Sequence, residues 1–369
     1  MWVAASLLAL GACTSAPTSE PDRARALSWS ELPGWPEPGL ASAWPAFMAG
    51  CTRLPERDTS WAAICEDAAL LGEVDDDIAR AFFETRFVPF AMRNEDGGRE
   101  GLVTGYYEPL LRGSLARSAR YRYPVYRPPE DLVSVDLGAL YPELKNRRVR
   151  GRLLGRRVVP YFERAQIDNG HAPLAGNELL WVDDPVALFF LQIQGSGRVR
   201  LDTGEQLHVG YADQNGHPYV AIGRRLVELG VLKPEEVELA TIRDWLKANP
   251  EKASHIMNAN PSYVFFALRD PALPGPLGSL GVPLQRERAI AVDPRHVALG
   301  SPVWLDTTLP DDPAPYRRLV FAHDTGGAIR GPVRADLFFG QGAQAERLAG
   351  RMKQPGRIYV LLPAQRPSF

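Results

Sequence analysis

The last third of the chain places the tightest limits on its fold. Between residues 282 and 363, short runs rich in β-branched and aromatic residues alternate with short connections. The expected strands are 289–292, 302–305, 318–323 and 357–362. One short helix is expected over 343–352. Many short strands with almost no helix between them predict a small closed β-barrel.

The chain before this region predicts helices first and mixed structure afterwards. A helical pattern begins at Trp44 and continues over 64–90. Strand-like runs cover 101–109, 120–129 and 179–185, and a hairpin is expected over 199–211. Helices are expected again at 219–229 and 234–248. We interpret 187–197 as an apolar run closed by a Gly-Ser-Gly turn, and 258–276 as a turn-rich connection.

Length and charge bound the class of protein. The chain has 369 residues, which is enough for a large core and two domains. Its formal net charge is −2, with arginines interleaved among aspartates and glutamates, so no nucleic-acid partner is expected. No internal apolar run reaches the roughly 20 residues that a membrane-spanning helix needs.

The N-terminal segment is typical of an exported lipoprotein. Residues 1–12 are apolar and end in Leu10-Gly11-Ala12 before Cys13. This ending resembles the bacterial lipobox, in which the cysteine is lipidated; a chance cysteine after a plain signal peptide is the alternative. We expect 1–13 to be the lipoprotein signal and 14–44 a tether. Thr14 in place of an aspartate favours the outer membrane of a Gram-negative bacterium, with the protein facing the periplasm.

Two further cysteines, Cys51 and Cys65, predict a disulfide. Thiols of exported chains meet an oxidising compartment, where a remaining pair often joins. The bridge would close a loop of about 14 residues and contribute about 3 kcal/mol. Two buried free thiols are the alternative. No metal is expected, because no Cys or His spacing fits zinc and the acidic run 75–77 lies where it complements a helix dipole.

Two carboxylates dominate the chemistry that the sequence offers. Asp324 lies in His-Asp-Thr-Gly-Gly, and Asp336 follows twelve positions later in Arg-Ala-Asp-Leu-Phe-Phe-Gly. An aspartic protease is one interpretation, because Asp202-Thr-Gly supplies a second copy of the first motif. It is weak, since Glu205 and Gly327 stand where those proteases carry Ser or Thr. A glycosidase is another, with Asp324 and Asp336 as the paired carboxyls and abundant aromatics for sugar stacking.

Six motifs occur in a fixed order. They are Gly105-Tyr-Tyr-Glu-Pro109, Gln192-Ile-Gln-Gly-Ser-Gly197, Gly210-Tyr211, Asn215-Gly-His-Pro-Tyr219 through Ile222-Gly223, Asn260-Pro-Ser-Tyr-Val-Phe-Phe266 and Asp324-Thr-Gly-Gly-Ala-Ile-Arg-Gly331. Together they resemble the membrane-bound lytic murein transglycosylase A family. The resemblance covers roughly residues 60 to 363, which is most of the chain.

The resemblance implies a mainly β fold with flanking helices. In this family a double-psi β-barrel carries a second, smaller β-domain inserted into it, with the substrate groove between them. On this chain the catalytic barrel would take 45–107 and 276–369. The inserted, β-rich substrate-binding domain with its helical connection would take 108–275. The second half of the barrel resembles the three-aspartate domain, whose aspartates match Asp293, Asp324 and Asp336.

The resemblance also implies an activity. Lytic transglycosylases, acting within chains or from their ends, cleave the β-1,4 bond between N-acetylmuramic acid and N-acetylglucosamine in peptidoglycan and leave 1,6-anhydromuramoyl ends. Asp336 matches the single catalytic acid and base, and its neighbours Leu337, Phe338 and Phe339 should raise its pKa. Asp324 would support it, and Asp293 would fix a barrel turn. The main rival is a non-catalytic peptidoglycan-binding barrel lipoprotein.

Further residues are candidates for contacts with the sugar. They are Tyr106, Tyr107, Gln194, Ser196, Tyr263, Gly326 and Gly327, with a place in the core as the alternative for the aromatics. The histidines, among them His208 and His323, are expected to be hydrogen-bonded structural residues. Expected partners are peptidoglycan glycan strands and the outer membrane, through lipid on Cys13, and cell-wall remodelling proteins are left open. No cofactor and no nucleic acid are implied.

Overall fold

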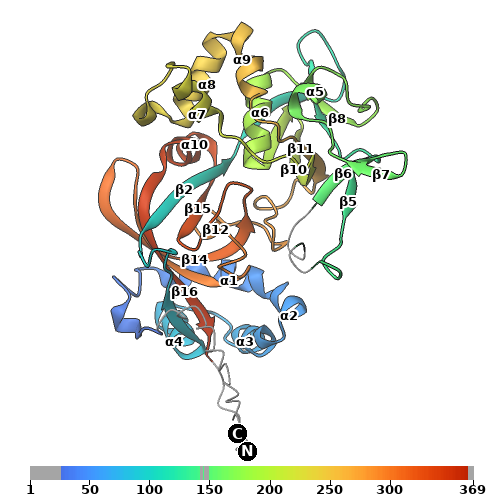
Figure 1. The fold of residues 1–369 in the computed structure, drawn as a ribbon. Coiled ribbons are helices and arrows are strands. Elements are labelled where there is room, and N and C mark those ends of the chain that lie inside the picture. Colours follow the sequence, from blue (N-terminus) through green and yellow to red (C-terminus); the bar gives the residue numbers. More distant parts are fainter. Residues whose placement is uncertain (1–25, 142–143, 145–148, 365–369) are drawn as a thin grey trace, which may run out of the picture.

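The computed structural model describes residues 26–141, 144 and 149–364, and its main body is a closed barrel (Figure 1). The sheet order is β1-β16-β13-β14-β12-β15-β2, and β16 also pairs with β2, which closes six strands into a ring and leaves β1 at an edge. The strands are β1 Phe87–Ala91, β2 Gly101–Glu108, β12 Ala289–Val292, β13 Pro302–Leu309, β14 Asp312–Thr325, β15 Arg334–Gln341 and β16 Lys353–Pro363. The barrel predicted from the sequence is therefore present.

The expected strands of this region are all found, and β15 is an addition to them. Helix α10, Gly342–Arg351, lies where a helix was predicted. In β15, Ala335, Leu337 and Phe339 belong to the barrel core while Arg334 and Asp336 stand on the other face. Arg334 and Asp336 interrupt the apolar residues of β15, so this strand lacks the apolar run that marks the others.

Helices at the N-terminal end pack against one side of the barrel. They are η1 Trp29–Glu31, η2 Leu40–Ala43, α1 Trp44–Cys51, α2 Leu54–Arg57, α3 Ser60–Ala69 and α4 Asp76–Arg86. The prediction of a helical pattern through residue 90 is wrong at two points. Asp75 caps a new helix by accepting a hydrogen bond from the Ile78 amide at 2.8 Å, and Phe87 begins strand β1, which pairs with β16.

Two features tie this helical layer together. Cys51 of α1 and Cys65 of α3 form a disulfide, with their Cα atoms 5.4 Å apart, so the suggested pair is linked. The described part of the predicted tether packs on the barrel, where buried Glu37 accepts hydrogen bonds from Arg288 at 2.6 Å and Arg318 at 2.7 Å. Cys13 and the rest of the predicted signal lie outside the described residues. No helix in the described ranges is long and apolar enough to cross a membrane.

Between β2 and β12 the chain builds a second body. Its main sheet has the order β11-β10-β9-β3-β8-β4, and a smaller one has β5-β6-β7. The strands are β3 Leu110–Ser114, β4 Tyr123–Tyr126, β5 Val133–Val135, β6 Val149–Leu154, β7 Arg157–Val159, β8 Glu178–Val182, β9 Ser196–Leu201, β10 Gln206–Gln214 and β11 Val264–Arg269. The helices are α5 Arg164–Asp168, α6 Pro185–Gln194, α7 Ile222–Glu228, η4 Pro234–Glu236, α8 Leu239–Ala248 and α9 Pro250–Met257.

Two sequence interpretations of this body change. The apolar run before the Gly-Ser-Gly turn is helix α6, capped by the Asp184 carboxylate at its start and ended by Gly195 at φ 80°. The segment around Tyr263 contains strand β11, which pairs with β10. A short apolar run fits helix and strand alike, and tertiary packing decides between them.

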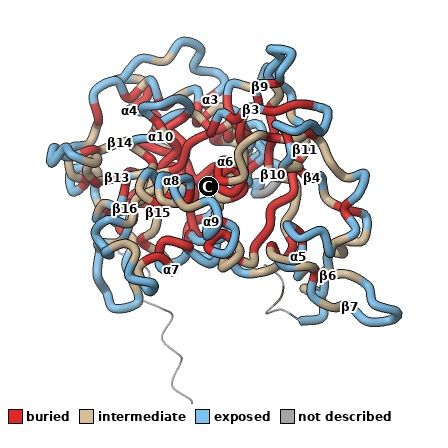
Figure 2. The backbone as a smooth tube through the Cα atoms, turned by 90° about the horizontal axis from the view of Figure 1, so that it is seen from above, coloured by how far each residue is buried: buried red, intermediate tan, exposed pale blue. Residues whose placement is uncertain are grey.

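The two bodies meet where β2 passes into β3 through Pro109. Glu108, fully buried at this point, lies 2.7 Å from the His208 ring and 3.3 Å from Arg198, both of the second body. It also accepts a hydrogen bond from Gln341 of the barrel. Figure 2 shows buried backbone running through both bodies, with the hairpin β6–β7 exposed at the periphery. The domain limits drawn from the sequence, 108 and 275, remain predictions.

Candidate active site

Three neighbouring barrel strands, β14, β12 and β15, place the carboxylates of Asp324 and Asp336 at the same height in the sheet. Strand β12 lies between β14 and β15, and Ala291 is the register partner of Asp324 on one side and of Asp336 on the other. Asp336 is in turn paired with Thr104 of β2. Residues that are directly opposite in a sheet point to the same face. Both carboxylates therefore stand on one face of the barrel, although twelve residues separate them in the chain.

A small apolar cluster surrounds the carboxylates on this face. Its buried members are Tyr106, Leu284, Ala289, Ala291, Ile329 and Phe338. Leu337 and Phe339, which the sequence analysis expected to act on Asp336, face the barrel core instead. Of the three predicted apolar neighbours, only Phe338 shares the face of Asp336, and the rest of the apolar surroundings comes from distant parts of the chain.

Asp336 has the surroundings of a proton donor. Its Oδ1 accepts a hydrogen bond of 2.5 Å from the Thr104 hydroxyl, and Arg334 donates to the same hydroxyl at 2.9 Å. Burial raises the pKa of Asp336 to about 6, against the lowering effects of the Thr104 hydrogen bond and the Arg334 charge; the Asp324 charge adds to the increase. This carboxyl can thus hold and release a proton near neutral pH.

Asp324 is held more firmly. Its Oδ1 accepts hydrogen bonds of 2.9 Å from the Ser279 amide, the Ser279 hydroxyl and the Thr325 amide, and its Oδ2 accepts one of 3.1 Å from the Tyr106 hydroxyl. Burial raises the pKa of Asp324, and the hydrogen bonds act in the opposite direction. A carboxylate bound by four donors is suited to fix its surroundings.

Asp293 anchors the loop that follows Asp324. Its buried carboxylate accepts hydrogen bonds from Arg295 at 2.5 and 2.9 Å and from the Gly331 amide at 2.9 Å. The Arg295 hydrogen bonds hold the pKa of Asp293 well below its usual range, against the opposing effect of burial. The contact to Gly331 ties the loop 326–331 to the residue that follows β12.

The candidates for sugar contacts fall into separate groups. Tyr106 is buried and donates to Asp324, while Tyr107 packs in the barrel core on the opposite face of β2. Gln194 accepts a hydrogen bond from the Tyr107 amide at 3.0 Å, and Ser196 begins β9 close by, partly exposed. Gly326 and Gly327 follow Asp324 in the partly exposed loop.

Tyr263 lies in the core of the second body. Its ring is 2% exposed and packs against Phe265 in the core of the second body, where the Arg164 guanidinium also lies over it. A side chain so enclosed contributes to the packing of this core. The core alternative of the sequence analysis therefore applies to Tyr263.

Other side chains around the carboxylates went unrecognised in the sequence. Thr104, Ser279 and Arg334 carry hydrogen bonds of the site. Thr104 lies one residue before the Gly105 motif and Arg334 two residues before Asp336, whereas Ser279 lies in none of the motifs. Next to Asp324, His323 is fully buried, and neither ring nitrogen has a hydrogen-bond partner among the described residues. The expectation of a hydrogen-bonded His323 is therefore wrong, because its apolar surroundings offer no partner.

The structure also separates the two Asp-Thr-Gly sequences. Asp202 is exposed in the turn between β9 and β10 of the second body, whereas Asp324 belongs to barrel strand β14. Because the four donors to Asp324 come from Ser279, Thr325 and Tyr106, the paired loops of an aspartic protease are not formed. Within the described ranges, no group of three or more His, Cys, Asp or Glu could hold a metal ion.

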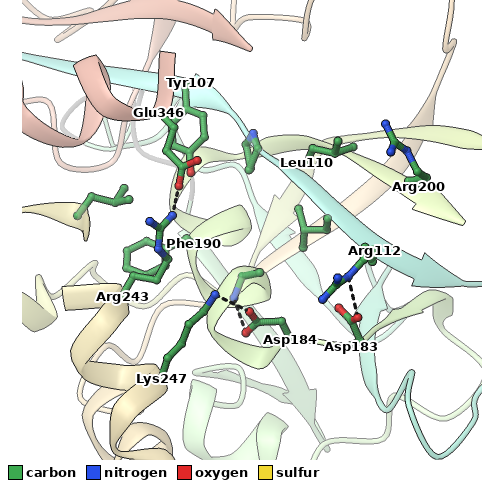
Figure 3. Close-up of a pocket in the computed structure, with 14 residues that line it drawn as sticks. Tyr107, Leu110, Arg112, Asp183, Asp184, Phe190, Arg200, Arg243, Lys247 and Glu346 are labelled. Carbon is green, nitrogen blue, oxygen red and sulfur yellow. Dashed lines mark hydrogen bonds and ion pairs between the residues drawn. The ribbon is translucent and has the colours of Figure 1, made fainter. Parts of the chain in front are cut away.

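A pocket of about 470 Å³ opens on the other face of the β2–β3 connection. Its walls come from β3, β9, α6, α8 and α10 (Figure 3). Tyr107 lines it, and Tyr106, the next residue back, belongs to the carboxylate site. This pocket is thus distinct from the face that carries Asp336.

Comparisons with known proteins agree with the fold. Residues 102–267 match the MltA specific insert domain, and residues 288–362 match the 3D domain. The membrane-bound lytic murein transglycosylase A of Vibrio cholerae is 29% identical over 72% of this chain and 67% of its own length. The crystal structure of MltA from Neisseria gonorrhoeae is 36% identical over 93% of this chain and 94% of that one, with a TM-score of 0.79. The lytic transglycosylase LtgG of Burkholderia pseudomallei is 44% identical over 94% and 97%, with a TM-score of 0.61.

A closed barrel with an inserted β-domain and two unequal carboxylates on one face define a peptidoglycan-degrading lytic transglycosylase. The match with the solved structures extends over nearly the whole of both chains. The chain belongs to the membrane-bound lytic murein transglycosylase A family.

Proposed function

We propose that this lytic transglycosylase cleaves the β-1,4 bond between N-acetylmuramic acid and N-acetylglucosamine with Asp336 as its only acid and base. One observation supports the assignment: Asp336 combines a pKa of about 6 with a single side-chain donor among the described residues, the Thr104 hydroxyl. Asp324, in contrast, has its acceptor positions occupied by Ser279, Thr325 and Tyr106. A group that must exchange a proton with substrate needs a free lone pair, and Asp336 has one.

The reaction then needs no second base. Protonated Asp336 gives its proton to the glycosidic oxygen as the bond from C1 of the muramoyl residue breaks, which releases the N-acetylglucosamine hydroxyl. The resulting carboxylate takes the proton of the muramoyl C6 hydroxyl, whose oxygen bonds to C1 and closes the 1,6-anhydro ring. Intramolecular attack has a high effective concentration, so no water has to be positioned. Asp336 ends protonated, as it began.

Asp324 and Asp293 would support the reaction without exchanging a proton with the substrate. The negative charge of Asp324 disfavours a second negative charge on Asp336 and stabilises the positive charge that develops at C1. Asp293 holds the 326–331 loop through Gly331, which sets where the Gly326 and Gly327 backbone can approach a sugar. Gln194 and Ser196, at the edge of the second body next to β2, would contact the neighbouring sugar residues.

Product analysis tests the proposal. Purified murein sacculi are digested with the enzyme, and the released fragments are identified by mass spectrometry. Anhydromuramoyl ends are expected. Reducing muramic ends would make the protein an ordinary hydrolase, and binding without any product would make it the non-catalytic peptidoglycan-binding lipoprotein.

Two variants sharpen this experiment. Asp336→Asn should bind murein without cleaving it, while Asp202→Asn, a matched change at an exposed turn, should cleave like the wild type. If Asp202→Asn also lost activity, the paired-aspartate interpretation would return. Lysis retained by Asp336→Asn would transfer the acid to another carboxyl, with Asp324 first to be examined.

The cellular location belongs to the same proposal. The relatives are named membrane-bound, and lipid on Cys13 would anchor the enzyme in the outer membrane facing the periplasmic murein. Cys13→Ser should leave the protein in the soluble periplasmic fraction, whereas the wild type should float with outer-membrane vesicles. Equal partition of the two proteins between the fractions would remove the anchor from the proposal.

A further inference from the structure

The pocket of about 470 Å³ behind the β2–β3 connection carries positive charge on two opposite walls. Arg112 of β3 and Arg200 of β9 stand on one side, and Arg243 and Lys247 of α8 stand on the other (Figure 3). Three carboxylates, those of Asp183, Asp184 and Glu346, also line it. The question is how much of the positive charge they neutralise.

The carboxylates are already engaged. Asp183 is shared by two arginines, Arg112 at 3.0 Å and Arg120 at 3.2 Å. Asp184 caps helix α6 through its Oδ1 and meets Lys247 at 3.2 Å through its Oδ2. Glu346 is paired with Arg243. Within the described part of the chain, no carboxylate pairs with Arg200, and Asp183 has to serve two guanidinium groups.

The strand register places two of these cations next to each other. Arg112 and Arg200 are direct partners in the parallel pair β3–β9, so their side chains leave the sheet side by side. Like charges placed opposite each other across strands are destabilising. A guanidinium group can, however, bind a carboxylate through two parallel hydrogen bonds, so a ligand carboxylate would offset the repulsion between the two arginines.

The rest of the lining is apolar. Pro109, Leu111, Ala187, Phe190 and Leu239 form it, and Leu110 at the rim is 56% exposed. The volume falls in the range of ligand pockets, which are lined mainly by apolar side chains with a few polar groups that orient the ligand. A small ligand with both hydrocarbon and carboxylate groups suits this combination better than a bare inorganic anion.

We propose that this pocket binds a short carboxylate-bearing peptide, and specifically a peptide stem of murein. The choice of stem rests on the proposed function, because the polymer that the enzyme degrades carries short peptides with several free carboxylates. Arg200, which has no carboxylate partner among the described residues, would receive a carboxylate together with Arg112, and the apolar lining would contact the hydrocarbon part of the peptide. The pocket would then recognise peptide-bearing murein while the barrel face that carries Asp324 and Asp336 acts on the glycan.

Binding is tested with the free stem tripeptide, L-Ala–γ-D-Glu–meso-diaminopimelate, titrated calorimetrically into the full-length enzyme. The wild type should bind it, and Arg112→Gln/Arg200→Gln should bind it at least about tenfold more weakly, a loss of about 1.4 kcal/mol. Arg224→Gln, an exposed change on α7, is the matched control and should bind like the wild type. Thermal melting checks that the double variant is folded, and single variants replace it if it is not.

The outcomes separate this proposal from the function on which it rests. The double variant should raise KM for peptide-bearing sacculi about tenfold and leave KM for peptide-free glycan within about twofold. Three results would each overturn the pocket assignment. The wild type could fail to bind the tripeptide, the double variant could bind it equally well, or equimolar acetate or phosphate could displace the bound tripeptide. Because tripeptide binding is also measured in Asp336→Asn, a wrong catalytic assignment would leave this result standing.

Discussion

Asp324 and Asp336 flank the same residue, Ala291, from the two strands on either side of β12. Two strand spacings place their Cα atoms about 10 Å apart. Each carboxyl is bound by donors of its own: four from three residues for Asp324, one side-chain donor for Asp336. The two carboxyl groups therefore differ in their surroundings: Asp324 is held by four donors, whereas Asp336 is free to exchange its proton.

Replacing the two aspartates one at a time should give different losses. Asp336→Asn removes the only acid and base, and the rate of anhydro-product formation should fall by about 10³-fold or more. Asp324→Asn can keep an oxygen toward the Ser279 and Thr325 donors, but it removes the charge and the acceptor of the Tyr106 hydroxyl, and a fall of about 10- to 100-fold is expected. The rates are measured on sacculi at saturating enzyme. Equal losses would show that the two carboxyls share one role.

The pH dependence of the reaction should report Asp336. Its proton is needed for the first step, and the pKa of about 6 in the folded enzyme lies above the usual value because of burial. As pH rises through about 6, kcat/KM should therefore fall, about tenfold per pH unit on the alkaline side. Thr104→Val removes the hydrogen bond that lowers this pKa, so the fall should move to higher pH. A profile that is flat between pH 5 and 8 would exclude Asp336 as the limiting acid.

Tyr106→Phe distinguishes support of Asp324 from contact with substrate. The change removes the 3.1 Å hydrogen bond to Asp324 and little else, because the ring is buried against Phe338. The loss of one such bond costs about 1 to 2 kcal/mol, so kcat should fall about tenfold while KM changes less than about twofold. A raised KM with unchanged kcat would instead assign Tyr106 to sugar binding, as the sequence had suggested.

Local sequence signals were enough for much of the barrel. The runs that became β12, β13, β14 and β16 are apolar and flanked by turn residues, and α10 has a regular helical period. Strand β15 could not be predicted in this way, because Arg334 and Asp336 interrupt its apolar pattern. The aspartate that matters most was found through the family motif, and the strand that carries it was not predicted.

Non-local pairing accounts for what the sequence could not predict. Asp324 and Asp336 lie next to each other because both are register partners of Ala291 on the neighbouring strands β14 and β15. The pairing of Thr104 with Asp336 joins residues on either side of the whole inserted body. Ser279 reaches Asp324 from a connection without any motif. No period or composition encodes such contacts, because they arise only when the barrel closes.

The buried His323 predicts a loss of stability in acid. Burial lowers its pKa from 6.5 to about 4, and both ring nitrogens lack hydrogen-bond partners among the described residues. Since the unfolded chain binds this proton more readily, the stabilising contribution is complete above pH 6.5 and is lost as pH falls toward 4. The loss amounts to about 3 kcal/mol in the free energy of unfolding.

His323→Leu tests this loss, because leucine has a similar volume and no titratable group. Between pH 7.5 and pH 4, the free energy of unfolding of the wild type should fall by about 3 kcal/mol more than that of His323→Leu. Urea unfolding at both pH values measures the difference, with His255→Gln, at an exposed position of α9, as the control that should follow the wild type. Parallel losses in His323→Leu and the wild type would mean that His323 is solvated or paired in solution.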